Sequence, residues 1–250
     1  MSGMGFGTGL SPILFFLGYS VLQIVPALLI AQTISGLMSA WFDHVFENIN
    51  FKFAPPNDAT KYAFLFAFVG CLAIIVSIFI GYFAITIPEF IIKTYIAILV
   101  FIMGGIGIIR LKLNKRIKKM SKKQEYTHPK LLFLFSAIAG FNKGLTSGGY
   151  GPVITLGQIF SGVYEKSARA IVAFSESLVS IMGTISFLVI AWAGVPIDLV
   201  LLPSIFTGGF FGSLIAPYIV RVLPNKVWRI FIPIYALFLG SLILINLLLF

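Results

Sequence analysis

The chain has 250 residues, of which 59% are hydrophobic and 10% are charged, and its mean hydropathy is +1.03. A soluble domain carries about 25% charged residues, so this composition excludes a disordered chain and an ordinary soluble protein. The formal net charge of +10 is concentrated between positions 110 and 130, which hold nine of the 18 basic side chains and one acidic side chain.

Long unbroken apolar runs favour an α-helical membrane protein over an outer-membrane barrel, whose strands alternate apolar and polar residues. A spanning helix needs about 20 apolar residues. In chain order, the segments of that length are 26–46, 62–86, 90–109, 168–193, 197–220 and 227–250. The apolar stretches 13–17, 131–141 and 152–160 are too short to span. The expected fold class is therefore an all-α polytopic membrane protein.

The two halves of the chain repeat one pattern. A glycine-rich stretch that ends in proline occurs at 7–12 and again at 147–152, and each is followed by a short apolar segment ending in Gly18 or Gly162. An internal repeat of about half the chain is typical of transporters. The pattern predicts three parts. They are a first transmembrane repeat at 1–109, a basic cytoplasmic linker at 110–130 and a second transmembrane repeat at 131–250.

The basic linker 110–130 is expected in the cytoplasm, because loops rich in Lys and Arg remain on that side. The spans on both sides of it favour this interpretation over nucleic-acid binding. If 131–160 is a re-entrant hairpin of two half-helices, the loop 163–169 with Lys166 and Arg169 is cytoplasmic. The basic loop 221–229 is then also cytoplasmic, and the uncharged loop 193–198 is outside. If 131–160 were a single broken span, the basic loop 221–229 would lie outside and the uncharged loop 193–198 inside, which contradicts the charge rule. We therefore expect the hairpin, two inverted-topology repeats, and both termini outside the cell.

The two glycine-rich stretches are predicted to be breaks between half-helices. Irregular backbone at membrane depth must be surrounded by protein or a water-filled cavity. Proline suits the first turn of a helix, so half-helices are expected to begin at Pro12 and Pro152 with their partly positive N-termini directed at the breaks. Two facing N-termini predict a site for a small anion. The candidate binding residues are Gly7, Thr8, Gly9, Ser11, Pro12, Asn142, Lys143, Thr146, Ser147, Gly148, Gly149, Tyr150, Gly151 and Pro152. Glycine packing without a ligand is the alternative, and it is the role expected of Gly208 and Gly212.

Glu176 is the only acidic residue deep in a predicted span, about 14 Å from its start at 1.5 Å per residue. Burial favours the neutral form of a carboxylate, so Glu176 is the candidate for proton coupling. A neutral acid that fixes helix packing is the alternative. When Gly18 is superposed on Gly162, Gln32 takes the place of Glu176, and Ser175 is the neighbouring polar residue. Lys143 either draws the anion into the site or extends to the cytoplasmic interface.

Other reactive side chains are few. Cys71 is the single cysteine, so we expect neither an intramolecular disulfide nor a cysteine metal site. His44 and His128 lie near loops, and we expect no metal and no cofactor. The first residues carry no basic side chain, so no cleavable signal peptide is expected.

Two sets of residues resemble the two repeats of the sulfite exporter TauE/SafE family. The first set is 5–14, 18–19 and 23–29, and the second is 147–153, 161–162 and 175–176. His44 and Asn48 resemble a stretch that follows the first long helix of the family. The likeness extends over nearly the whole chain and implies a prokaryotic plasma-membrane carrier of sulfite, sulfonates or related anions, coupled to protons. The half-helix 131–141 has no counterpart before Met1. Either the first residue of the sequence is placed too late, or this member of the family lacks the corresponding half-helix.

The function expected is secondary transport of a small inorganic or organic anion, by alternating access in the lipid bilayer. A passive anion channel would use the same site without titration of Glu176. An intramembrane enzyme would need Ser147 as nucleophile with a base beside it, and His44 and His128 do not suit that role. We therefore do not expect an enzyme. The sequence does not indicate an oligomeric state.

Overall fold

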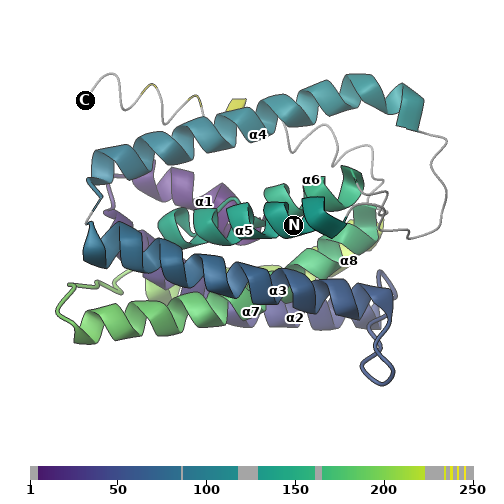
Figure 1. Ribbon diagram of the computed structural model, residues 1–250, viewed down its shortest axis with the longest axis horizontal. Helices are drawn as coiled ribbons and strands as arrows, with labels where there is room; N and C mark the ends of the chain where they lie inside the picture. Colours follow the sequence, from purple (N-terminus) through teal and green to yellow (C-terminus); the bar gives the residue numbers. More distant parts are fainter. Residues whose placement is uncertain are drawn as a thin grey trace.

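The computed structural model describes residues 5–85, 87–117, 129–160 and 165–222, together with 234, 237, 238, 241 and 245. Within this part of the chain, helices are the regular structure and no strand forms, so the all-α class is confirmed (Figure 1). The elements are α1 (Gly5–Phe16), α2 (Val21–Val45), α3 (Asp58–Ile78), the π-helical segment η1 (Phe79–Ala84), α4 (Glu89–Ile117), α5 (Pro129–Thr146), α6 (Tyr150–Phe160), α7 (Glu165–Trp192) and α8 (Leu202–Val222).

Four stretches of described helix are long and apolar enough to cross a membrane. They are Val21–Val45, Asp58–Ala84, Ala168–Trp192 and Leu202–Ile219. Each corresponds to a span predicted from the sequence. The predicted span 90–109 lies within α4, and the predicted span 227–250 lies outside the described residues except for isolated positions. The structure is thus that of a multi-pass helical protein.

Polar residues fix the start of the first long helix. Ser20 and Gln23 form a capping box at the start of α2: the Ser20 Oγ accepts from the Gln23 backbone N–H at 3.3 Å, and the Gln23 Oε1 accepts from the Ser20 N–H at 2.9 Å. This reciprocal capping satisfies two amides that the helix leaves unpaired. The helix therefore begins five residues before Pro26, where the sequence analysis placed the span, and Pro26 lies inside it.

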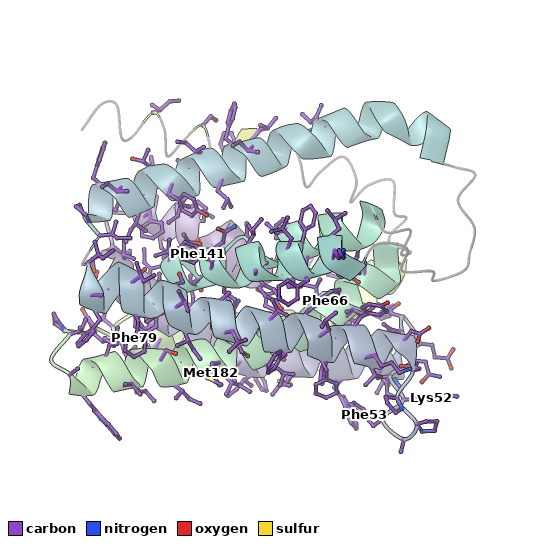
Figure 2. All side chains as sticks on the ribbon, viewed as in Figure 1. Lys52, Phe53, Phe66, Phe79, Phe141 and Met182 are labelled. Carbon is purple, nitrogen blue, oxygen red and sulfur yellow. The ribbon has the colours of Figure 1, made fainter. Side chains whose placement is uncertain are left out.

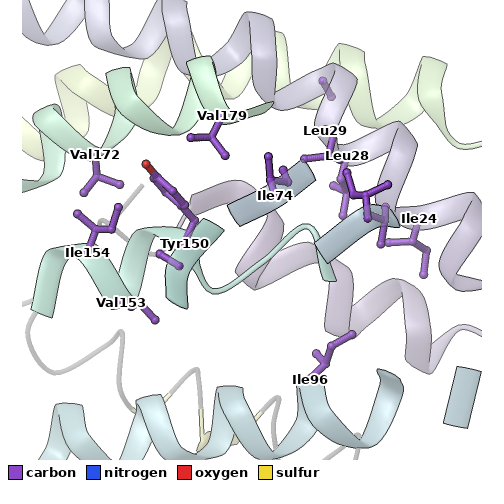
Figure 3. Packing of buried hydrophobic residues seen from close by; sticks show 14 of the residues in the cluster. Ile24, Leu28, Leu29, Ile74, Ile96, Tyr150, Val153, Ile154, Val172 and Val179 are labelled. Atoms are coloured by element: carbon purple, nitrogen blue, oxygen red, sulfur yellow. The ribbon is translucent and has the colours of Figure 1, made fainter. Parts of the chain in front are cut away.

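The short helices lie inside the molecule. In Figure 1, α1, α5 and α6 are found between α4 on one side and α2, α3 and α7 on the other. The helices α3 and α5 pack together, as do α2 and α7. Figure 3 shows the apolar core between them, in which Leu28 and Leu29 of α2 lie near Ile74 of α3, and Tyr150 of α6 lies near Val179 of α7.

The outer surface of the bundle is apolar, as a lipid-facing surface must be. On α3, Phe64, Phe68, Leu72 and Val76 follow one another at four-residue spacing and are all exposed. Residues four apart lie on one helix face. Figure 2 shows that carbon-rich side chains cover the outside of the helices, whereas Lys52 lies in a loop at one end. This surface fits hydrocarbon rather than water.

Two long-range polar contacts tie α2 to the second half of the chain. At the start of α2, the Gln23 Nε2 donates to the Asp198 Oδ2 at 2.7 Å. This bond, together with the Val200 backbone N–H, holds the pKa of Asp198 below its ordinary value. At the other end of α2, Asp43 forms an ion pair with Arg169 near the start of α7. The start of α2 and the predicted loop 193–198 therefore lie at one end of the bundle.

The ion pair between Asp43 and Arg169 is buried, and the sequence analysis did not find it. Arg169 was expected in a cytoplasmic loop, but it lies inside α7 with 8% of its surface exposed, while Asp43 is 0% exposed. Asn48 also donates to the Asp43 Oδ1, at 2.8 Å. The expectation was wrong because a carboxylate 126 positions away compensates the charge of the guanidinium.

Breaking this pair on one side should destabilise the protein strongly. Asp43→Asn is expected to lower the free energy of unfolding by about 3–5 kcal/mol, because it leaves a buried guanidinium without its counter-charge. Denaturant or SDS titration followed by circular dichroism measures the loss. The control is Lys61→Ala, which removes the exposed pair with Asp58 at 3.9 Å and should cost less than about 1 kcal/mol. Equal effects of the two variants would contradict a buried, structural pair.

Candidate functional site

The helices α5 and α6 form an antiparallel hairpin, as the sequence predicted. The two helices pack on each other, and a Cβ added at Gly157 of α6 would lie 2.9 Å from the ring of Phe135 of α5. At the end of α6, the Gln158 Nε2 donates to the Ala168 carbonyl of α7 at 3.2 Å. A single broken span would carry α6 away from α5, so the hairpin interpretation is confirmed over that alternative.

The apex of the hairpin comprises residues 147–149 and has an irregular backbone. Ser147 has φ 56° and Gly149 has φ 79°, values in the left-handed region that favours glycine. The Thr146 hydroxyl accepts from the Gly148 N–H at 3.1 Å and donates to the Asn142 carbonyl at 2.8 Å. Immediately after the apex, α6 begins at Tyr150. Pro152 therefore lies in the first turn of a half-helix, as predicted.

The corresponding prediction for the first half of the chain is wrong. Residues 7–11 are not a break: α1 begins at Gly5, and Pro12 lies inside the helix. Glycine and proline disfavour helix locally, but contacts with the hairpin apex compensate for this. A Cβ at Gly7 would overlap the Ser147 carbonyl, so only glycine permits this approach. Pro12 also removes the amide that would bond the Thr8 carbonyl.

The N-terminal turn of α1 nevertheless faces the N-terminus of α6. The Thr8 Oγ1 accepts from the Gly149 N–H at 2.7 Å. Ser11 is buried on the same side, with its Oγ 3.4 Å from the position of a Cβ added at Gly148. The first described turn of α1 therefore lies against the start of α6, although α1 starts earlier than expected. The N-terminus of α6 directs partial positive charge toward the apex.

Lys143 is the centre of the polar contacts beside this apex. Its Nζ donates to the Glu176 Oε1 at 2.9 Å and also to the Gln32 Oε1. The side chain is 0% exposed, and its Nζ lies 5.7 Å from the centre of the Tyr150 ring. An extension of Lys143 to the membrane interface is therefore excluded in this structure. One lysine connects the two side chains that the repeat places in equivalent positions.

Gln32 joins this lysine to the hairpin apex. Its Nε2 donates to the Ser147 carbonyl at 3.2 Å and lies 3.3 Å from the Ser147 Oγ. The site therefore contains a cation, a carboxylate, an amide and hydroxyls beside the N-terminus of α6. Such a network can bind an oxyanion through charge-assisted hydrogen bonds. Among the described residues, no cluster of His, Cys, Asp and Glu could hold a metal ion.

The remaining predicted residues have differing places. Tyr150 presents its ring to Lys143, and its hydroxyl donates to the Phe66 carbonyl at 3.1 Å. The Ser175 hydroxyl donates to the Val172 carbonyl at 3.1 Å, within its own helix. Gly9 is partly buried in α1, and Gly151 is buried in the first turn of α6.

Tyr95 is a site residue that the sequence analysis missed. Its hydroxyl, on α4, donates to the Asn142 Oδ1 one residue before Lys143. A single tyrosine in an apolar span gives no sequence signal of such a contact. His44, at the far end of α2, accepts from the Phe51 N–H. It is about 18 Å from Gln32 along the helix, and His128 lies outside the described residues.

Gly149→Val should abolish anion binding while the protein still folds. A β-branched side chain resists a positive φ, and its Cβ would lie 3.1 Å from Leu99, so the start of α6 must shift. The control is Gly208→Val. Gly208 was expected to pack closely, but this prediction was wrong. The residue is exposed, and no described atom lies within 4 Å of an added Cβ. Binding measured by isothermal titration with sulfite should persist in the control. Binding by Gly149→Val equal to that of the wild type would mean that the anion binds elsewhere.

Comparison with known proteins agrees with this geometry. The model of the family described as "Sulfite exporter TauE/SafE" matches residues 1–243. Neither a curated protein nor a solved structure matches the chain. The family match includes α1, α2, the hairpin and α7, and it confirms the resemblance of both halves. The chain is a multi-pass membrane protein that belongs to the TauE/SafE family of sulfite exporters.

Proposed function

We propose that the protein is a secondary transporter of a small anion, a sulfur oxyanion or organosulfonate such as sulfite. The observation that carries the proposal is the contact of Thr8 of α1 with the start of α6, beside the fully buried Lys143. The anion would accept hydrogen bonds from Lys143 and the first amides of α6, with the hydroxyls of Thr8 and Ser147 around it. Membership of a family of exporters supports this class of cargo.

Transport by alternating access between two inverted repeats is the second part of the proposal. The repeats are 1–109 and 131–250, joined by the linker 110–130. Gln32 on α2 and Glu176 on α7 contact the same lysine from equivalent positions. Polar contacts connect the repeats at both ends of α2, through Asp198 and through Arg169. Because Lys143 is closed off from solvent in this arrangement, an anion can reach it only when the repeats move apart.

Proton coupling through Glu176 is the third part. Its side chain is 10% exposed and lies against Lys143 near the middle of α7. A carboxylate in that place can alternate between a charged, paired form and a neutral form. A passive channel needs no such exchange. An enzyme is a weaker alternative, because the Ser147 hydroxyl contacts the Gln32 amide rather than a histidine.

Counterflow in proteoliposomes tests the proposal. Vesicles preloaded with unlabelled sulfite should accumulate labelled sulfite, whereas protein-free vesicles should not. Thr8→Val removes the acceptor of the Gly149 N–H without changing the size of the side chain, and it should slow exchange about tenfold, as expected for one lost buried hydrogen bond. Thr207→Val, at an exposed position of α8, is the matched control. Absence of counterflow for sulfite, thiosulfate and sulfonates would refute anion transport.

The proposed topology places the linker 110–130 in the cytoplasm of a prokaryotic cell and both termini outside. Single cysteines on a Cys71→Ala background test it with an impermeant thiol reagent. Val200→Cys, in the exposed loop beside Asp198, should be labelled in intact cells. Asn225→Cys should react only after the membrane is opened. The reverse labelling pattern would contradict the proposed topology and show that the protein has the opposite orientation.

A further inference from the structure

The charge balance at Lys143 determines when an anion can bind. The Nζ is paired with Glu176 at 2.9 Å, and it has no exposed surface. Lysine and glutamate together carry no net charge, so the paired site offers an incoming anion little attraction. If the anion displaced Glu176, the carboxylate would remain buried without a partner, which is strongly unfavourable. The charge of the Glu176 carboxylate must therefore be removed before the anion binds.

We propose that Lys143 is shared in turn by Glu176 and the transported anion, so that each anion binds together with one proton. This inference rests on the proposed anion site. A proton from water binds a carboxylate oxygen of Glu176, the ion pair with Lys143 separates, and the Nζ donates to the anion instead. When the anion leaves, Glu176 releases the proton to water and pairs with Lys143 again.

Gln32 keeps the lysine in place during this exchange. Its Oε1 accepts from the Nζ, while its Nε2 donates to the Ser147 carbonyl at 3.2 Å. An amide has no charge to lose, so this contact persists whether Glu176 is charged or neutral. The two repeat-equivalent side chains thus have different tasks: Glu176 titrates, and Gln32 orients the ammonium toward the hairpin apex.

Glu176 is the carboxylate that contacts Lys143 in this network, and the proposal assigns the proton to it. The titratable groups on the elements around it are Lys143 on α5, Tyr150 on α6 and Cys71 on α3, and α2 contributes the non-titrating Gln32. Tyrosine and cysteine are ordinarily neutral at neutral pH, so they do not compete with the carboxylate for this role. Asp43 on α2 is paired with Arg169, about 10 Å from Glu176 along α7.

Proton counting during anion binding tests the proposal directly. Methanesulfonate and thiosulfate serve as probes, because their charge does not change between about pH 5 and pH 9, whereas sulfite itself titrates. Isothermal titration of the purified full chain in two buffers of different protonation enthalpy gives the number of protons taken up. We expect one proton per anion above the pH at which Glu176 ionises, and an affinity that falls about tenfold per pH unit there.

The variant Glu176→Gln should bind the probes without proton uptake and with an affinity independent of pH. The matched control Glu47→Gln, at an exposed loop position, should take up protons as the wild type does. Binding by the wild type without proton uptake at any pH would overturn the inference, even if Glu176→Gln fails to fold. Proton uptake that persists in Glu176→Gln would overturn it as well. If the wild type binds neither these probes nor sulfite, the anion site itself is refuted, which is a separate result.

Discussion

Lys143→Met is expected to abolish anion binding, with a loss of affinity of about 100-fold or more. The substitution keeps most of the length and apolar surface of the side chain but removes its charge. A hydrogen bond from a charged group contributes about 1.5–3 kcal/mol, and the variant also leaves Glu176 without its partner at 2.9 Å. An unpaired carboxylate would repel an incoming anion. Isothermal titration with sulfite measures the loss.

A double variant separates this role from a structural one. Lys143→Met should lower the stability of the protein because Glu176 is left buried and unpaired. Lys143→Met combined with Glu176→Gln should recover most of the stability, because no charge remains unpaired, but it should not recover binding. Lys61→Met, at an exposed position near the start of α3, is the control. Recovery of binding in the double variant would show that Lys143 only supports the fold.

Glu176→Gln is expected to uncouple transport from the pH gradient. Glutamine keeps the shape and hydrogen bonding of the neutral acid but cannot titrate. Counterflow of labelled sulfite should continue, whereas a pH gradient should no longer drive net uptake. The stimulation by the gradient, about tenfold per pH unit for one coupled proton at the thermodynamic limit, should fall to none. Gln32 at the equivalent place shows that the network accommodates an amide.

A purely structural role of Glu176 predicts a different outcome. Glu176→Gln would then keep its response to the gradient, and Glu176→Leu would fail because a buried hydrogen bond to Lys143 is lost. Measuring counterflow and gradient-driven uptake for both variants distinguishes the two roles. Full gradient-driven uptake by Glu176→Gln would show that another group carries the proton or that no proton is coupled.

The sequence was most informative where structure is local. Length and apolarity alone predicted the spans in α2, α3, α7 and α8, because a helix in hydrocarbon must satisfy its own backbone. Charge on the flanking loops predicted the hairpin of α5 and α6. The predicted start of α1 was wrong because glycine and proline disfavour helix locally. The contact between Gly7 and Ser147 that compensates for this joins residues far apart in the sequence.

Long-range pairing was the part that the sequence could not give. Lys143 meets Gln32 across 111 positions, and Arg169 meets Asp43 across 126. From the sequence, Lys143 had two alternative roles, Arg169 was assigned to a loop, and Asp43 was not noticed. The repeat did give one useful constraint, because it placed Gln32 and Glu176 in equivalent positions. That constraint did not reveal that both contact one lysine.

Anomalous diffraction from crystals grown with selenite tests the proposed site most directly. Selenite has the shape and charge of sulfite and contains an atom that can be located without ambiguity. We expect a selenium peak at the start of α6, with selenite oxygens in hydrogen-bond reach of the Lys143 Nζ and with Glu176 no longer paired to it. A selenium peak elsewhere in the protein, with the ion pair of Lys143 and Glu176 intact, would contradict the account.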